Sequence, residues 1–119
     1  MQTCKKVAGH VKVSSVNAVA KSPAALKAAV EKSVVSVGVQ AKGIFMNYKG
    51  GILNNAQCGT ALDHAVNVVG WGSAGSQDYY IVRNSWGTGW GESGYARVAA
   101  VAGNGICGIQ MNANFPTTN

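Results

Sequence analysis

Two side chains in this sequence, His64 and Asn84, have the chemistry and the spacing of a general base and its orienting partner. His64 lies in a run of β-branched and aromatic residues at 62–72, and Asn84 lies in a second such run at 78–91. Residues 73–77 between them are turn formers, so the two runs predict an antiparallel β-hairpin. If this hairpin folds about the middle of the turn, the two side chains are diagonal neighbours on one face. A side-chain carbonyl beside an imidazole fixes its tautomer, as a base that activates a nucleophile requires.

Both runs carry motifs that resemble those of the papain-like cysteine peptidases. Residues 63–66, D-H-A-V, are similar to the strand that holds the family's catalytic histidine. Residues 84–95, N-S-W-G-T-G-W-G-E-S-G-Y, are similar to the motif that begins with its orienting asparagine. A lone histidine in an apolar strand is usually structural, but two linked motifs favour catalysis. The resemblance, most specific over residues 34–116, implies that His64 and Asn84 are catalytic residues of a Cys-His-Asn site that hydrolyses peptide bonds.

The length of the chain bears on how much of such an enzyme is present. A chain of 119 residues with 47% hydrophobic content can form one domain with its own core. The resemblance implies an enzyme of about twice this size, built as two lobes with the active site between them. We therefore expect residues 1–119 to be a single domain, the right-hand (His/Asn) lobe, with the first lobe absent. The implied fold class is α+β, a mostly antiparallel, barrel-like sheet with one helix on its N-terminal side.

The sequence lacks the family's nucleophile motif and its oxyanion-hole glutamine, so we expect the isolated chain to be inactive. The resemblance assigns both groups to the first lobe, where the cysteine would pair with His64 across the cleft. Two alternatives remain open at this stage. The chain can be read as a non-catalytic binding or structural module that keeps this lobe, or as an excised folding fragment.

Three cysteines, Cys4, Cys58 and Cys107, allow several roles. They form no C-x-x-C pair, and the chain has only two histidines, so a zinc site is not indicated. The resemblance implies a disulfide between Cys58 and Cys107, and hence an oxidising compartment. Cys4 is the only candidate nucleophile within the chain. Residues 2–6 nevertheless lack the glycine and tryptophan of the nucleophile motif, and the resemblance favours a half-cystine whose partner lies in the first lobe.

The resemblance also implies a set of substrate-binding residues. They are Gly38, Leu62, Asp63, Ala65, Trp86, Trp90 and Asn112. Gly38 would widen one wall of the specificity pocket, or it marks a β-bulge or a close packing contact. The neutral Asn112 at the pocket base favours an apolar or mixed substrate side chain over a basic one. Trp86 is expected to shield the Asn–His hydrogen bond from water, and Trp90 to lie near the cleft on the leaving-group side. Tryptophans most often simply pack in a core, and this alternative stays open for both.

The remaining pattern predicts the elements that position these residues. Residues 22–33 predict a helix, with Ser22 as its N-cap and Pro23 at its first position. Alternating residues predict strands at 34–40 and 94–101. These elements pack the domain and carry no chemistry of their own.

Charge and composition limit the partners. The formal net charge is +6, but the cations are mostly scattered lysines between Lys5 and Lys49, without an arginine cluster, which excludes a typical nucleic-acid site. No run approaches the roughly 18 to 20 apolar residues of a membrane span. The resemblance implies no cofactor, and it implies a peptide or protein substrate and the missing lobe as partners. An exposed half-cleft, with Leu62 and Trp90, is expected to promote self-association.

The start of the chain bears on its cellular location. Residues 1–6 show no apolar run of a signal peptide. Since the family is mostly made as secreted or lysosomal precursors, we expect that Met1 is not the natural start. The parent protein is then expected to be secreted, lysosomal or vacuolar.

Overall fold

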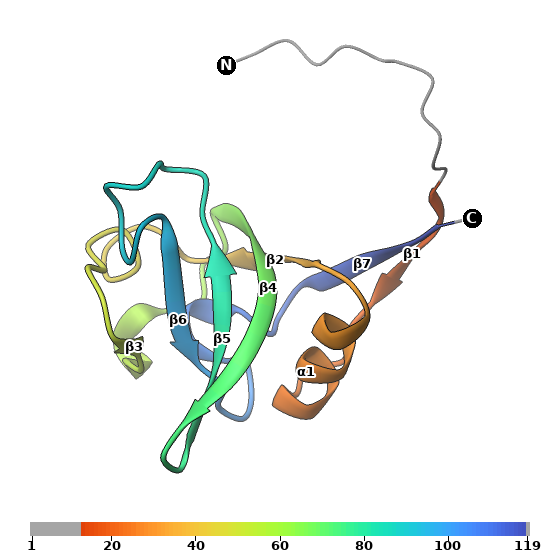
Figure 1. Ribbon diagram of the computed structural model, residues 1–119, viewed down its shortest axis with the longest axis horizontal. Coiled ribbons are helices and arrows are strands. Elements are labelled where there is room, and N and C mark those ends of the chain that lie inside the picture. The colour runs from red at the N-terminus through yellow and green to blue at the C-terminus, as the bar shows by residue number, and fades with distance from the viewer. Residues whose placement is uncertain (1–12, 119) are drawn as a thin grey trace, which may run out of the picture.

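The computed structural model describes residues 13–118, which form a seven-stranded sheet and one α-helix (Figure 1). The strands are β1 (Val13–Ala18), β2 (Val35–Val39), β3 (Ile52–Leu53), β4 (His64–Ala74), β5 (Gln77–Arg83), β6 (Tyr95–Ala99) and β7 (Ala113–Thr118). The helices are α1 (Pro23–Lys32) and two short 3-10 turns, η1 (Ala56–Cys58) and η2 (Ile106–Gly108). The strand order is β1-β7-β2-β4-β5-β6-β3, and every pairing is antiparallel except that of β3 with β6. The predicted α+β class is confirmed.

Helix α1 begins where the sequence predicts. The Ser22 side chain accepts a hydrogen bond from the Ala25 N–H at 3.1 Å, and proline occupies the first turn. Leu26 and Ala29 are buried on the face that packs toward β4, as Figure 1 shows for the helix beside that strand.

The β4–β5 hairpin has the predicted connection but contains a bulge. Ala74 pairs with Gln77 across a two-residue turn. If this register continued unchanged along the hairpin, Asn67 would lie opposite Asn84. The pairing instead shifts between Val68 and Gly70, and Asn67 then lies opposite Arg83. The bulge therefore sets the register at the end of the hairpin where His64 and Asn84 face each other.

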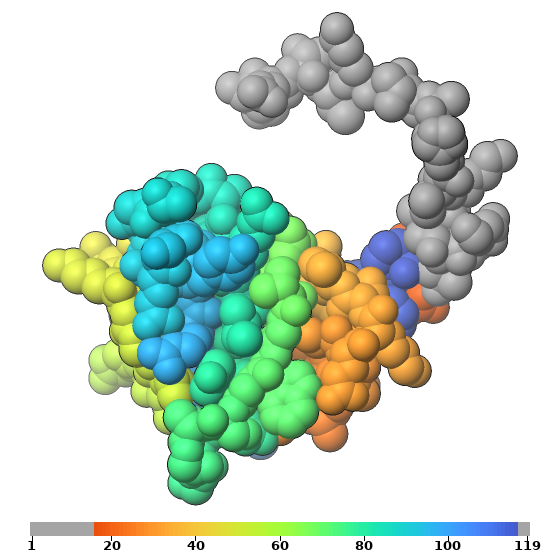
Figure 2. Space-filling model, viewed as in Figure 1, coloured from red at the N-terminus to blue at the C-terminus, as the bar shows by residue number. Residues whose placement is uncertain are grey.

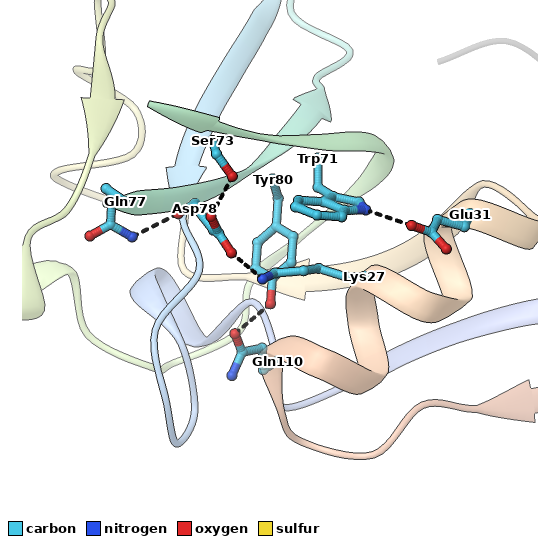
Figure 3. A network of polar contacts seen from close by, with 8 residues as sticks. All are labelled: Lys27, Glu31, Trp71, Ser73, Gln77, Asp78, Tyr80 and Gln110. Atoms are coloured by element: carbon cyan, nitrogen blue, oxygen red, sulfur yellow. Dashed lines mark hydrogen bonds and ion pairs between the residues drawn. The ribbon is translucent and has the colours of Figure 1, made fainter. Parts of the chain in front are cut away.

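A polar cluster fixes α1 to the far end of this hairpin (Figure 3). Lys27 forms an ion pair with Asp78, which also accepts a hydrogen bond from the Ser73 hydroxyl. The hydrogen bonds from Lys27 and then Ser73 lower the pKa of Asp78 below its ordinary value. The Lys27 ammonium also lies 4.7 Å from the centre of the Trp71 ring, a cation–π contact. On the other side, the Trp71 indole donates to Glu31 at 3.3 Å.

The core holds the predicted disulfide and one buried polar pair. Cys58 and Cys107 are bonded and join η1 to η2, with their Cα atoms 4.8 Å apart, so this prediction is confirmed. Closing a loop of 49 residues reduces the entropy of the unfolded chain, worth about 4 kcal/mol in the chain-entropy account. The Tyr80 hydroxyl donates to Gln110 at 2.7 Å inside the core. Cys4, the third cysteine, lies outside the described residues.

Within residues 13–118, no helix combines the length and the apolar character needed to cross a membrane.

The Tyr80–Gln110 pair gives a direct test of this core. We expect Tyr80→Phe to lower the free energy of unfolding by about 1 to 3 kcal/mol, because the buried Gln110 oxygen loses its donor. Tyr95→Phe, at an exposed tyrosine, is the matched control and should change it by no more than about 0.5 kcal/mol. Urea unfolding measures both. Equal effects of the two substitutions would contradict a stabilising role for the buried bond.

Candidate active site

His64 and Asn84 meet at the end of the hairpin. His64 is the first residue of β4, and Asn84 directly follows β5. The His64 Nε2 and Asn84 Oδ1 atoms are 2.8 Å apart. Asn84 is only 7% exposed, and His64 is half-buried. The structure thus brings together the two residues that the motifs single out.

The hydrogen bonds around Asn84 define which atom of the imidazole carries the proton. Asn84 Oδ1 also accepts the backbone N–H of Ser85 at 2.8 Å. Because a backbone N–H can only donate, the amide atom at this position must be the oxygen. His64 Nε2 must then donate to the same oxygen, and in the neutral ring Nδ1 keeps its lone pair. The arrangement presents Nδ1 as the basic atom of the site.

Trp86 covers one face of the imidazole. Its ring is stacked on that of His64, with centroids 4.8 Å apart and planes 20° from parallel. Phe45 meets the Trp86 ring edge-on at 6.0 Å. The Trp86 side chain is itself 39% exposed, so it stands between the imidazole and solvent. This placement agrees with the shielding role, which stays a prediction.

Trp90 occupies a different environment from the one expected. It is only 8% exposed, so the expectation that it contributes to an exposed apolar surface is wrong. Its ring packs against Phe45 at 4.9 Å and Tyr48 at 5.4 Å. Its indole N–H donates to the carbonyls of Phe45 and Met46, both at 3.2 Å. Burial follows because both the ring and its polar atom find partners inside the chain.

A polar network that the sequence analysis missed holds the same loop. The Glu92 carboxylate accepts two hydrogen bonds from Arg97, each 2.9 Å long, and one from the Gly51 N–H at 3.1 Å. The hydrogen bonds from Arg97 and then from Gly51 lower the pKa of Glu92 to about 2. The Tyr48 hydroxyl donates to the Gly51 carbonyl at 2.6 Å and accepts the Arg97 N–H at 3.2 Å. The five-residue spacing of Glu92 and Arg97 around a turn was the signal that could have indicated this pair.

Four predicted pocket residues come together beside β2. Gly38 pairs with Ala65 across β2 and β4, and its N–H donates to the Asn112 carbonyl at 3.1 Å. A Cβ atom on Gly38 would lie 3.2 Å from Leu62 Cδ1, a close contact. The β2–β4 pairing runs without a register shift, so Gly38 does not mark a bulge. The close packing contact at Gly38 is thus observed, and its role as a pocket wall stays a prediction.

Asp63 is fixed by the main chain on the side of β2. Its carboxylate accepts the Ala41 N–H at 2.7 Å, and its own N–H donates to the Val39 carbonyl at 3.0 Å. These bonds hold the residue that precedes His64, so Asp63 sets the start of β4.

Among the described residues, no group of three or more His, Cys, Asp or Glu side chains is placed to hold a metal ion.

Comparison with known proteins places this geometry among proteases. The family described as "Papain family cysteine protease" matches residues 1–117. Papaya proteinase 4 of Carica papaya is 42% identical over 125 residues, covering 99% of this chain and 36% of the relative. Germination-specific cysteine protease 1 of Arabidopsis thaliana is 49% identical over 100 residues, covering 81% and 26%.

Solved structures give the same result. The bromelain protease of Ananas comosus, solved with the E64 inhibitor, has a TM-score of 0.86 and 38% identity, covering 98% of this chain and 56% of that one. The Carica candamarcensis protease CMS1MS2, also solved with E-64, has a TM-score of 0.81 and 44% identity, covering 91% and 50%. The chain therefore spans about a third or less of these two curated relatives and about half of each solved chain.

The Glu92 network predicts an acid-sensitive loop. Because the folded state lowers the pKa of Glu92 from 4.5 to about 2, its stabilisation is present above pH 4.5 and is lost as the pH falls toward 2. The side chain is 34% exposed, so we expect a loss of about 1 kcal/mol or less. Urea unfolding of the wild type and Glu92→Gln should show a stability difference that shrinks between pH 5 and pH 3. Glu31→Gln, which removes a carboxylate without an arginine partner, is the control. A Glu92→Gln difference that is independent of pH would contradict the assignment.

Proposed function

This chain belongs to the papain family of cysteine proteases, and from that premise we propose that it is the histidine–asparagine lobe of a cysteine endopeptidase. The single observation that carries the proposal is the 2.8 Å contact between His64 Nε2 and Asn84 Oδ1. It leaves Nδ1 as the basic atom. The nucleophilic cysteine and the oxyanion-hole glutamine would belong to another lobe, so the isolated chain is inactive in this proposal.

In the proposed mechanism His64 transfers a proton in each of the two half-reactions. Nδ1 takes the proton of the cysteine thiol on the other lobe, which gives a thiolate and an imidazolium. The thiolate attacks the peptide carbonyl, and the oxyanion that forms is stabilised by hydrogen-bond donors of that lobe. The Nδ1–H of His64 then protonates the amine as the carbon–nitrogen bond breaks, which leaves a thioester. A water molecule gives a proton to Nδ1 and attacks the thioester, and the carbon–sulfur bond breaks to release the acid product and the cysteine. Throughout, Asn84 Oδ1 keeps Nε2–H in place and so keeps Nδ1 pointing at the reacting atoms.

The loop residues support this role of His64 by limiting the motion of its ring. Trp86 covers one face of the imidazole at 4.8 Å, and it excludes water from the Asn84 hydrogen bond. A hydrogen bond in a drier environment is electrostatically stronger, and the ring is then less free to rotate.

We propose that the substrate side chain enters the pocket formed by Gly38, Leu62, Ala65 and Asn112. Three of these positions offer apolar surface or no side chain, and Asn112 is neutral. None of the four carries a charge that would select a basic or acidic group. The pocket therefore suits an apolar or mixed side chain, with the substrate main chain passing Asp63 and Trp86.

The other lobe is the main proposed partner. It would cover the edge where His64 and Trp86 lie, and Leu62 and Trp86, both partly exposed, offer apolar surface there. A second copy of this chain can use the same surface when that lobe is missing. The Cys58–Cys107 disulfide suits an oxidising compartment, so we place the parent protein in a secreted, lysosomal or vacuolar setting.

A chimaera tests the proposed function. The chain is joined to the nucleophile-bearing lobe of Papaya proteinase 4, and hydrolysis of a fluorogenic peptide is measured for the chimaera and for the chain alone. We expect activity only in the chimaera, and we expect His64→Ala to lower kcat/KM by about 10² to 10⁴, the usual worth of a general base. Asn84→Ala should lower it by a smaller factor, because the base remains but is no longer oriented.

Trp71→Phe, in the polar cluster at the far end of the hairpin, is the control and should leave kcat/KM unchanged. Circular dichroism checks that each variant folds. A folded chimaera whose activity survives His64→Ala would overturn the proposal.

A further inference from the structure

Arg83 lies on the outer face of the sheet, in a row of polar side chains. It is the last residue of β5, and its partners across the sheet are Asn67 on β4 and Tyr95 on β6. Directly paired residues point to the same face of a sheet, and all three are exposed. Ser36 on β2 pairs with Asn67 and continues the row. The row gives this face hydroxyl, amide and guanidinium groups side by side.

The guanidinium of Arg83 has no carboxylate partner in the part of the chain that the structure describes. The sequence contains only four acidic side chains, and all of them lie within residues 13–118. Each is held elsewhere: Glu31 by Trp71, Asp63 by the Ala41 N–H, Asp78 by Lys27, and Glu92 by Arg97. Arg97 is the only other arginine in the chain, so one arginine is paired and the other is not.

Two hollows open on either side of Arg83. The larger, of about 430 Å³, extends from Arg83 under the loop that joins β5 to β6, and Ser85, Thr88, Ser93 and Tyr95 contribute to its walls. The smaller, of about 250 Å³, lies toward Asn67. The β5–β6 loop lies above the ends of these strands in Figure 1, and Figure 2 shows it in cyan at the top of the coloured part of the molecule. No acidic residue lines either hollow.

The walls of the larger hollow carry polar groups without partners. The hydroxyls of Ser85, Thr88, Ser93 and Tyr95 make no hydrogen bond within the described chain. Asn84 lies in the wall that the two hollows share, and its buried Nδ2 likewise lacks an acceptor. The Arg83 guanidinium adds donors and a positive charge to these hydroxyls, with no carboxylate in either wall, which favours a ligand that supplies oxygen acceptors and negative charge.

We propose that these hollows form a binding site for an acidic saccharide, with its carboxylate or sulfate group on Arg83. The planar guanidinium matches the two oxygens of such a group. The unpaired wall hydroxyls of Ser85, Thr88 and Ser93 match the hydroxyls of a sugar ring. The Tyr95 ring, 39% exposed, offers an apolar face to the ring's CH groups.

Other features favour a sugar over an acidic peptide. The walls of the larger hollow combine the hydroxyls of Ser85, Thr88 and Ser93 with the face of the Tyr95 ring, and a sugar ring presents the matching combination of hydroxyls and CH groups. The row of Arg83, Asn67 and Ser36 extends the polar surface across the sheet, where further sugar units would lie. His64 and Trp86 line neither hollow, and the site shares Asn84 with the candidate active site. The test below measures saccharide binding alone, so its outcome is separate from that of the proposed peptidase activity.

Binding of trigalacturonate to the 119-residue chain tests the proposal. Chemical shifts in ¹H–¹⁵N spectra are followed at low salt, with neutral galactotriose as the matched control. We expect trigalacturonate to bind in the millimolar range, with the largest shifts at Arg83, Ser85, Thr88 and Tyr95, and galactotriose at least tenfold more weakly. A sulfated galactotriose distinguishes the two oxyanions, because the tighter of the two acidic ligands identifies which group Arg83 prefers.

Two variants separate the site from general charge attraction. Arg83→Gln should reduce trigalacturonate affinity at least tenfold, and Arg83→Lys should reduce it less, since the charge remains but the two-pronged geometry is lost. Lys42→Gln removes the same charge at another exposed position and should leave the affinity unchanged. Equal losses in Arg83→Gln and Lys42→Gln, or equal binding of galactotriose, would overturn the proposal. Triglutamate that binds as tightly as trigalacturonate would overturn the assignment to a saccharide.

Discussion

The indole N–H of Trp90 is the contact on which the candidate active site depends most. It bonds to two main-chain carbonyls, of Phe45 and Met46, and so ties the glycine-rich loop after β5 to a segment more than 40 residues earlier. The Glu92–Arg97 network ties the same loop to Gly51. Because this loop has little regular structure of its own, these contacts decide where its other residues lie. Asn84 and Trp86 reach His64 from a loop that is fixed at its far side.

The second constraint is the register of the β4–β5 hairpin. The bulge after Val68 shifts the pairing by one residue, and a shift of one residue turns every side chain to the opposite face of a strand. The same hairpin is held at its other end by the Lys27–Asp78 pair on α1. The strand end that carries His64 is thus set by contacts at both ends of the hairpin, and there the imidazole meets the Asn84 oxygen.

The sequence predicts the parts of this arrangement that local chemistry encodes. Residue types and spacing predict the Ser22–Pro23 start of α1, the hairpin turn and the paired motifs around His64 and Asn84. The family resemblance predicts the disulfide. The bulge has no such signal, since Val68 and Val69 look like ordinary strand residues. The packing partner of Trp90 was not predictable either, because Phe45 is distant in sequence and only the folded chain brings the two residues together.

The tautomer of His64 tests the central claim most directly. Nitrogen-15 NMR of the imidazole in the 119-residue chain, at a pH where the ring is neutral, reports which nitrogen carries the proton. Our account predicts the proton on Nε2 in the wild type, because Asn84 Oδ1 accepts it, and a mixture of tautomers in Asn84→Ala. A ring protonated on Nδ1 in the wild type, or a tautomer that Asn84→Ala leaves unchanged, would contradict the account.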